Sequence, residues 1–248
     1  MNLLALVEAI RFLTIIPLPW VTTPMSERSI AASIPWFPVV GLLIGIVLLP
    51  IGWLGGWLWS DLVRAALLVV AWGVLTGGLH LDGLSDTFDA VMSWRPRERK
   101  LEIMKDSRIG AMGALALVAV LLLKVVWLEA AAANWWQAII LAPLWGRWAD
   151  IYGIFWFPPA REGGLGRSFR EQVQQRDFFT VSLVTVLAAA VVGGLAGMLA
   201  GVAVWGVTHV LARWWTRDLG GLTGDTYGAL CEIGEVVALA VLAAHLAR

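Results

Sequence analysis

The sequence predicts an all-α fold, a polytopic bundle of transmembrane helices. Hydrophobic residues make up 59% of the 248 residues and charged residues only 15%, whereas soluble domains carry about 25% charged residues. The mean hydropathy is +0.78. A core surrounded by water cannot bury this much apolar surface at this chain length, so the bilayer must solvate part of it. We expect one integral membrane domain over residues 1–248.

Charge and cysteine content argue against nucleic-acid binding and against redox chemistry. The 18 basic residues balance the 18 acidic residues, so the chain lacks the basic field that a nucleic-acid partner requires. The one cysteine, Cys231, cannot form an internal disulfide, and we interpret it as a packed helix residue.

The N-terminal segment predicts a helix that lies in the membrane interface. It is apolar but contains Glu8 and Arg11, and it lacks the basic start and cleavage site of a signal peptide. One helical face carries its apolar side chains, namely Leu3, Leu6, Val7, Ile10 and Leu13. Pro17 and Pro19 end this helix before it can span the membrane.

The remaining apolar windows predict about seven spans, because a span needs about 20 residues. Five windows lie at about 37–58, 62–79, 111–130, 136–157 and 227–246. The stretch 178–215 is too long for one helix, and its glycines at 193–201 favour two helices joined by a tight turn. Six spans remain if that run is only a kink.

The basic residues predict the orientation of the chain. Lys and Arg concentrate in the segments 80–110 and 158–177 and around Arg217, and seven spans place these segments on one face. Segments rich in Lys and Arg stay in the cytosol. We therefore expect the functional face to be cytosolic.

The segment after the second span carries three aspartates, Asp82, Asp86 and Asp89. Their spacing of i, i+4 and i+7 places them on one side of a helix, where like charges repel. Hard oxygen ligands without cysteine favour Mg²⁺ or Mn²⁺ over zinc. The alternative is a solvated helix end. His80 projects to the other side of the helix, which favours a packing or hydrogen-bonding role.

A second polar segment precedes the span at 111–130 and contains Lys105, Asp106, Ser107 and Arg108. A lysine and an arginine beside a helix N-terminus suit a phosphate or diphosphate, and an arginine can bind it with two hydrogen bonds. Ordinary anchoring by positive charge is the alternative, above all for Lys105.

A third polar segment runs from Arg217 to Asp225 and leads into the last span. Glu232 shares a helical face with Asp225, and Glu235 follows three residues later. Glutamates within an apolar helix must face the site or a basic partner. Arg147 and Asp150, three residues apart in the fourth span, are expected to pair with each other.

These segments resemble those of the cobalamin synthase family, whose members are also called cobalamin-5′-phosphate synthase or adenosylcobinamide-GDP ribazoletransferase. The similarity is carried by five segments in order along the chain: Phe12-Leu13-Thr14 with Pro17-Leu18-Pro19, Pro38-Val39-Val40-Gly41-Leu42-Leu43-Ile44-Gly45, Gly78-Leu79-His80-Leu81-Asp82-Gly83-Leu84-Ser85-Asp86-Thr87, Met104-Lys105-Asp106-Ser107-Arg108-Ile109-Gly110, and Leu219-Gly220-Gly221-Leu222-Thr223-Gly224-Asp225-Thr226.

The resemblance implies the last assembly step of vitamin B12 in a bacterial inner membrane. The enzyme joins α-ribazole or its 5′-phosphate to adenosylcobinamide-GDP, releases GMP and uses Mg²⁺. Asp82, Asp86 and Asp89 would bind the metal, and Lys105 and Arg108 would hold phosphate oxygens. We also expect Asp106, Ser107, Arg217 and Asp225 at the substrates, with Asp82, Asp89 and Glu232 in the chemistry and Asp89 or Glu232 as base. The expected partners are membrane lipid and either a second copy of the chain or other late cobalamin enzymes.

Two other classes of protein compete with this interpretation. An ion-coupled transporter also contains carboxylates within the membrane, but it places them near the midplane between inverted repeats. A membrane phosphotransferase of the CDP-alcohol type also uses clustered aspartates, but its characteristic Asp-Gly-x-x-Ala-Arg run is absent from this sequence.

Overall fold

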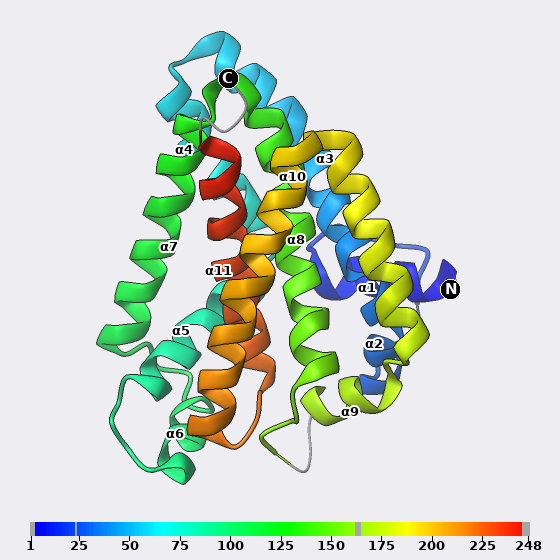
Figure 1. Ribbon diagram of the computed structural model, residues 1–248, viewed down its shortest axis with the longest axis vertical. Helices are drawn as coiled ribbons and strands as arrows, with labels where there is room; N and C mark the ends of the chain where they lie inside the picture. Colours follow the sequence, from blue (N-terminus) through cyan, green and yellow to red (C-terminus); the bar gives the residue numbers. More distant parts are fainter. Residues whose placement is uncertain (1–2, 23, 162–164, 245–248) are drawn as a thin grey trace.

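The computed structural model describes residues 3–22, 24–161 and 165–244. The described residues form an all-α bundle (Figure 1). In chain order the helices are α1 Leu3–Leu13, α2 Glu27–Ser33, the 3-10 turn η1 Ile34–Trp36, α3 Phe37–Leu58, α4 Asp61–Leu75, α5 Leu79–Val91, α6 Arg97–Ile103, α7 Ala111–Ala130, the 3-10 turn η2 Ala132–Asn134, α8 Trp135–Trp156, α9 Leu165–Gln172, α10 Gln175–Leu219 and α11 Gly224–Ala243.

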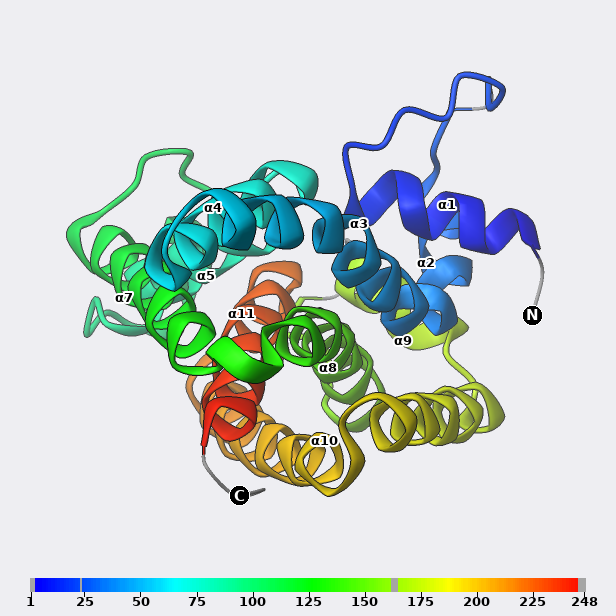
Figure 2. The ribbon, with the colours of Figure 1, turned by 90° about the horizontal axis from the view of Figure 1, so that it is seen from above.

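Helix α8 forms the centre of the bundle. Every residue from Ala138 to Ile154 is buried, and α3, α10 and α11 pack around this helix (Figure 2). Close approach depends on glycine: a Cβ atom on Gly41 of α3 would lie 2.3 Å from the carbonyl oxygen of Pro143. Small residues let helix backbones approach in this way inside a membrane.

Helix α10 is a hairpin of two helical arms. The backbone leaves the helical conformation at Gly194, where φ is 55° and ψ is −136°, values that essentially only glycine adopts. The arms run in opposite directions along the bundle (Figure 1). The predicted division of the stretch 178–215 in its glycine-rich run is therefore confirmed.

The predicted span at 62–79 is shorter than expected. Helix α4 ends at Leu75, and α5 leaves it at an angle of 90°. Gly77 and Gly78 form the corner with positive φ values of 61° and 70°, a conformation that glycine adopts without strain. The aspartates on α5 consequently lie beyond the bend.

The chain is a multi-span membrane protein. Among the described residues, four helices are long and apolar enough to cross a membrane, or five if α4 and α5 form one broken span. The prediction of seven spans counts the arms of α10 separately and includes α8, so it stays a prediction. The last predicted span at 227–246 ends outside the described residues, since α11 stops at Ala243.

The polar segments lie toward one end of the bundle, which contains α5, α6, α9 and the α10–α11 connection (Figure 1). Arg97 donates hydrogen bonds to the carbonyl oxygens of Leu219 at 2.6 Å and Ala160 at 2.9 Å. Lys100 binds both carboxylate oxygens of Asp218 at 2.7 Å. These basic residues therefore join loops that are distant in the sequence.

Candidate active site

Helix α5 carries the three predicted aspartates and packs against the start of α11. A Cβ atom on Gly83 would lie 2.7 Å from the carbonyl oxygen of Asp225. Only glycine permits this close contact, which brings Asp225 beside Asp82 and Asp86 although the sequence separates them widely. The structure thus joins the first and third polar segments.

Electrostatic repulsion is concentrated at Asp86. Partial burial and the neighbouring carboxylates of Asp82, Asp225 and Asp89 raise the pKa of Asp86 to about 7. Asp82 is exposed and Asp86 is half-buried. A bound cation would relieve this repulsion, as the sequence analysis expected.

Asp89 has different neighbours from the other two aspartates. Its carboxylate accepts hydrogen bonds from the backbone N–H groups of Gly110 at 2.7 Å and Gly113 at 2.8 Å. A Cβ atom on either glycine would lie 2.4 Å from the Asp89 carboxylate. Asp89 therefore caps the N-terminus of α7, a role that the sequence analysis did not foresee.

The predicted trio of metal ligands does not converge. Among the described residues, the one set of three metal-ligating side chains whose ligand atoms lie within 4.8 Å of one another is His80, Asp150 and Cys231. Mg²⁺ commonly needs only one or two carboxylates together with substrate phosphates. Asp82 and Asp86 meet that requirement without Asp89.

The segment before α7 presents its polar side chains to solvent. Arg108 donates hydrogen bonds to both carboxylate oxygens of Asp106, and its side chain is 86% exposed. These bonds lower the pKa of Asp106 to about 2. Lys105 and Ser107 are exposed as well, as is Arg217. The geometry leaves these groups accessible to a ligand and does not assign one.

Two cavities meet at Asp82. The larger, here called the outer cavity, has a volume of about 670 Å³ and lies between α5, α7 and the segment after α1, lined by Thr14, Gly77, Asp82, Ser85 and Leu117. The smaller, here called the aromatic pocket, has a volume of about 160 Å³ and is lined by Phe12, Phe37, Phe169 and Tyr227 together with Asp82, Asp150 and Asp225. Asp82 therefore lies where two bound groups would meet.

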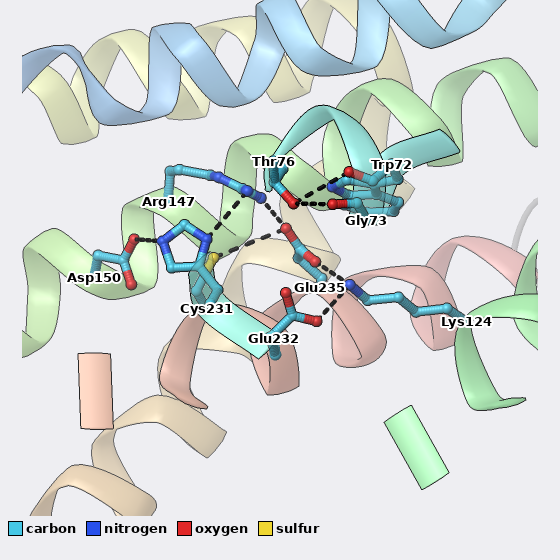
Figure 3. A network of polar contacts seen from close by, with 10 residues as sticks. Trp72, Gly73, Thr76, Lys124, Arg147, Asp150, Cys231, Glu232 and Glu235 are labelled. Atoms are coloured by element: carbon cyan, nitrogen blue, oxygen red, sulfur yellow. Dashed lines mark hydrogen bonds and ion pairs between the residues drawn. The ribbon is translucent and has the colours of Figure 1, made fainter. Parts of the chain in front are cut away.

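A network of buried charges fills the interior between α7, α8 and α11 (Figure 3). Lys124 binds Glu232 at 2.6 Å and also Glu235, and Arg147 binds Glu235. Of the two expected orientations of the glutamates, toward the site or toward a basic partner, the structure shows the second. Glu232 is 3% exposed and lines neither cavity, so the geometry favours a structural role over the expected catalytic one.

The expected pairing of Arg147 with Asp150 is wrong. Arg147 contacts Glu235 and lies 3.3 Å from Nδ1 of His80, whereas Asp150 lies 3.4 Å from Nε2 of the same histidine. Tertiary contacts with α5 and α11 have replaced the local pair. His80 has the hydrogen-bonding role that the sequence analysis favoured.

Lys124 belongs to this buried network, and the sequence analysis passed over it. It lies within an apolar helix, where a charged side chain is costly and normally faces the bundle interior. Its ammonium group also lies 4.3 Å from the ring centre of Trp72. A lone lysine in a 20-residue apolar window is the signal that could have predicted a buried acidic partner.

Comparison with known proteins gives one consistent result. The family described as cobalamin-5-phosphate synthase matches residues 5–243. The adenosylcobinamide-GDP ribazoletransferase of Roseiflexus sp. (strain RS-1) is 64% identical over 95% of this chain and 87% of its own length. The proteins of the same name from Herpetosiphon aurantiacus and Brevibacillus brevis are 51% and 38% identical over 96% of this chain. No solved structure matches the chain.

Proposed function

The chain belongs to the cobalamin-5-phosphate synthase family, and from this membership we propose that it acts as an adenosylcobinamide-GDP ribazoletransferase. It joins α-ribazole or its 5′-phosphate to adenosylcobinamide-GDP with release of GMP, the last assembly step of vitamin B12. The observation that assigns the proposed activity to a site is that Asp82 lies at the junction of two cavities. A reaction that joins two large substrates needs such a junction.

The proposed metal site consists of Asp82 and Asp86, whose hard oxygen atoms suit Mg²⁺. The raised pKa of Asp86 supports this site, because crowded carboxylates favour a cation. Bound Mg²⁺ would neutralise charge on the diphosphate of the donor. Asp89 is left out of the proposed ligand set because it already caps α7.

The proposed chemistry is a transfer to phosphorus. A ribose hydroxyl of the acceptor attacks the phosphorus bound to cobinamide, the new O–P bond forms, and the bond from that phosphorus to GMP breaks. The hydroxyl proton passes to a carboxylate. We assign this role to Asp225, since it lines the aromatic pocket beside Asp82, whereas Glu232 is bound to Lys124.

The proposed setting is the bacterial inner membrane with the site on the cytosolic face. The position of α6 and α9 at one end of the bundle supports it, because these two helices carry basic residues. The exposed Lys105, Arg108 and Arg217 are proposed to attract the phosphates of the substrates at this face. Assembly with a second copy or with other cobalamin enzymes is also a proposal.

The test is direct. The purified chain in lipid nanodiscs should release GMP when it receives adenosylcobinamide-GDP and α-ribazole or α-ribazole 5′-phosphate. Release should stop with a chelator and return with Mg²⁺. Absence of GMP release with either acceptor would contradict the proposed function, and full activity in chelator would contradict the metal site alone.

A further inference from the structure

The aromatic pocket is built from side chains that the proposed chemistry does not use. The rings of Phe12 and Phe37 stack with centres 6.0 Å apart, and Phe169 meets both edge-on at 6.3 Å and 6.5 Å. These rings come from α1, α3 and α9, which are distant in the sequence. Three rings at one wall form an apolar surface that suits a planar ring.

Two polar groups at the pocket have no hydrogen-bond partner within the described part of the chain. The carboxylate oxygens of Asp150 and the hydroxyl of Tyr227 are buried without a hydrogen bond, and Asp150 has only an ion-pair contact of 3.4 Å with Nε2 of His80. The two residues are 2% and 4% exposed. Buried groups of this kind are normally satisfied, so a ligand that supplies the missing bonds is expected.

The size of the pocket limits the ligand. Its volume of about 160 Å³ lies below the roughly 300–1,000 Å³ of cavities for drug-sized ligands. One ring system fits, whereas a corrinoid does not. The pocket is also lined by Asp82 and Asp225, where the proposed transfer takes place.

From these features we propose that the aromatic pocket binds the planar base of a nucleoside substrate, with its ribose or base edge hydrogen-bonded to Asp150 and Tyr227. This inference rests on the proposed function, which supplies two such bases: the benzimidazole of α-ribazole and the guanine of the donor. Stacking on phenyl rings is chemistry that both bases share. Guanine would donate its own N–H groups to the Asp150 carboxylate, whereas the ribazole, whose base carries no N–H, would donate ribose hydroxyls. The kinetic test distinguishes them.

The test uses the full chain in nanodiscs and compares Phe169→Leu with Phe179→Leu. Phe169 is 4% exposed in the pocket, whereas Phe179 is 52% exposed on α10 and lines no part of it. Phe169→Leu should raise KM for one nucleoside substrate about tenfold and leave KM for the other unchanged. A rise for α-ribazole assigns the pocket to the acceptor, and a rise for adenosylcobinamide-GDP assigns it to guanine. Unchanged KM values for both overturn the proposal.

A second pair of variants tests the polar wall. Asp150→Asn should raise the same KM, while Cys231→Ala should not, because the Cys231 sulfur lies within 4.8 Å of ligand atoms of His80 and Asp150 but Cys231 does not line the pocket. Equal effects of the two variants would indicate a metal held by His80, Asp150 and Cys231 and would overturn the role of Asp150. If Phe169→Leu does not fold, Phe12→Leu replaces it.

Direct binding separates failure of this inference from failure of the proposed function. Equilibrium dialysis with α-ribazole and with GMP measures affinity without turnover. If the native chain releases no GMP but binds one ligand, and Phe169→Leu weakens that binding, the pocket assignment stands alone. If the native chain is active and the Phe169→Leu and Phe12→Leu variants bind α-ribazole and GMP as tightly as the native chain, the pocket assignment fails and the proposed function stands.

Discussion

The three aspartates of α5 differ in what their carboxylates contact. Asp82 is exposed at the junction of the cavities, whereas Asp89 accepts two backbone N–H groups of α7. The sequence spacing predicted one helical face correctly. The spacing could not show that Asp89 differs in role from Asp82 and Asp86, because the groups that bind Asp89 lie at the start of another helix, α7.

We expect Asp82→Ala to abolish GMP release without lowering thermal stability, because its exposed carboxylate repels Asp86 and forms no hydrogen bond or ion pair within the described part of the chain. Asp89→Ala should lower the free energy of unfolding by about 1–2 kcal/mol, since α7 loses its cap. Thermal denaturation in detergent and a GMP assay check both. An active Asp82→Ala protein would refute the site.

The raised pKa of Asp86 predicts a pH dependence of metal affinity. The carboxylate binds Mg²⁺ only when ionised, and its pKa in the metal-free site is about 7. Affinity should therefore rise as pH increases, by about tenfold between about pH 6 and about pH 8. Half-saturating Mg²⁺ for GMP release is the measurement. Asp86→Asn should remove this pH dependence. An equal half-saturating Mg²⁺ concentration at about pH 6 and about pH 8 in the native chain would contradict the prediction.

At the scale of the element, glycines decide how helices end and how closely they approach. Gly77 and Gly78 turn α5 away from α4, and Gly194 reverses the chain direction within α10. Gly83 lets α11 pack closely against α5. The glycine-rich run in α10 could be predicted as a turn from composition. The 90° bend before α5 was missed, because the hydropathy of an apolar segment does not reveal where a helix ends within it.

The buried charges join α7, α8 and α11 into one unit. Lys124→Met should destabilise the bundle by about 3–5 kcal/mol, because Glu232 and Glu235 lose their shared ammonium group. Lys105→Met is the matched control, since Lys105 is exposed. Thermal unfolding in detergent compares them, and equal stability of the two variants would contradict the network.

At the scale of the whole molecule, the proposed topology can be tested with the one native cysteine removed. In a Cys231→Ala background, Ser107→Cys should react with an impermeant maleimide only when the cytosolic side is open. Asn134→Cys, in the connection between α7 and α8, should react from the outside. Helix α7 separates the two positions, so labelling from the same side would refute a span at 111–130.

The sequence by itself determined the membrane setting, the helical fold, the family and the residues that crowd charge at one face. These features depend on composition and on local spacing, and both can be read from the sequence of one segment without knowing what packs against it. The tertiary structure alone decided which charges meet: Arg147 binds Glu235 in preference to Asp150, and Asp225 joins Asp82. Pairing of this kind depends on how helices approach, and that approach is set by packing between segments distant in the chain.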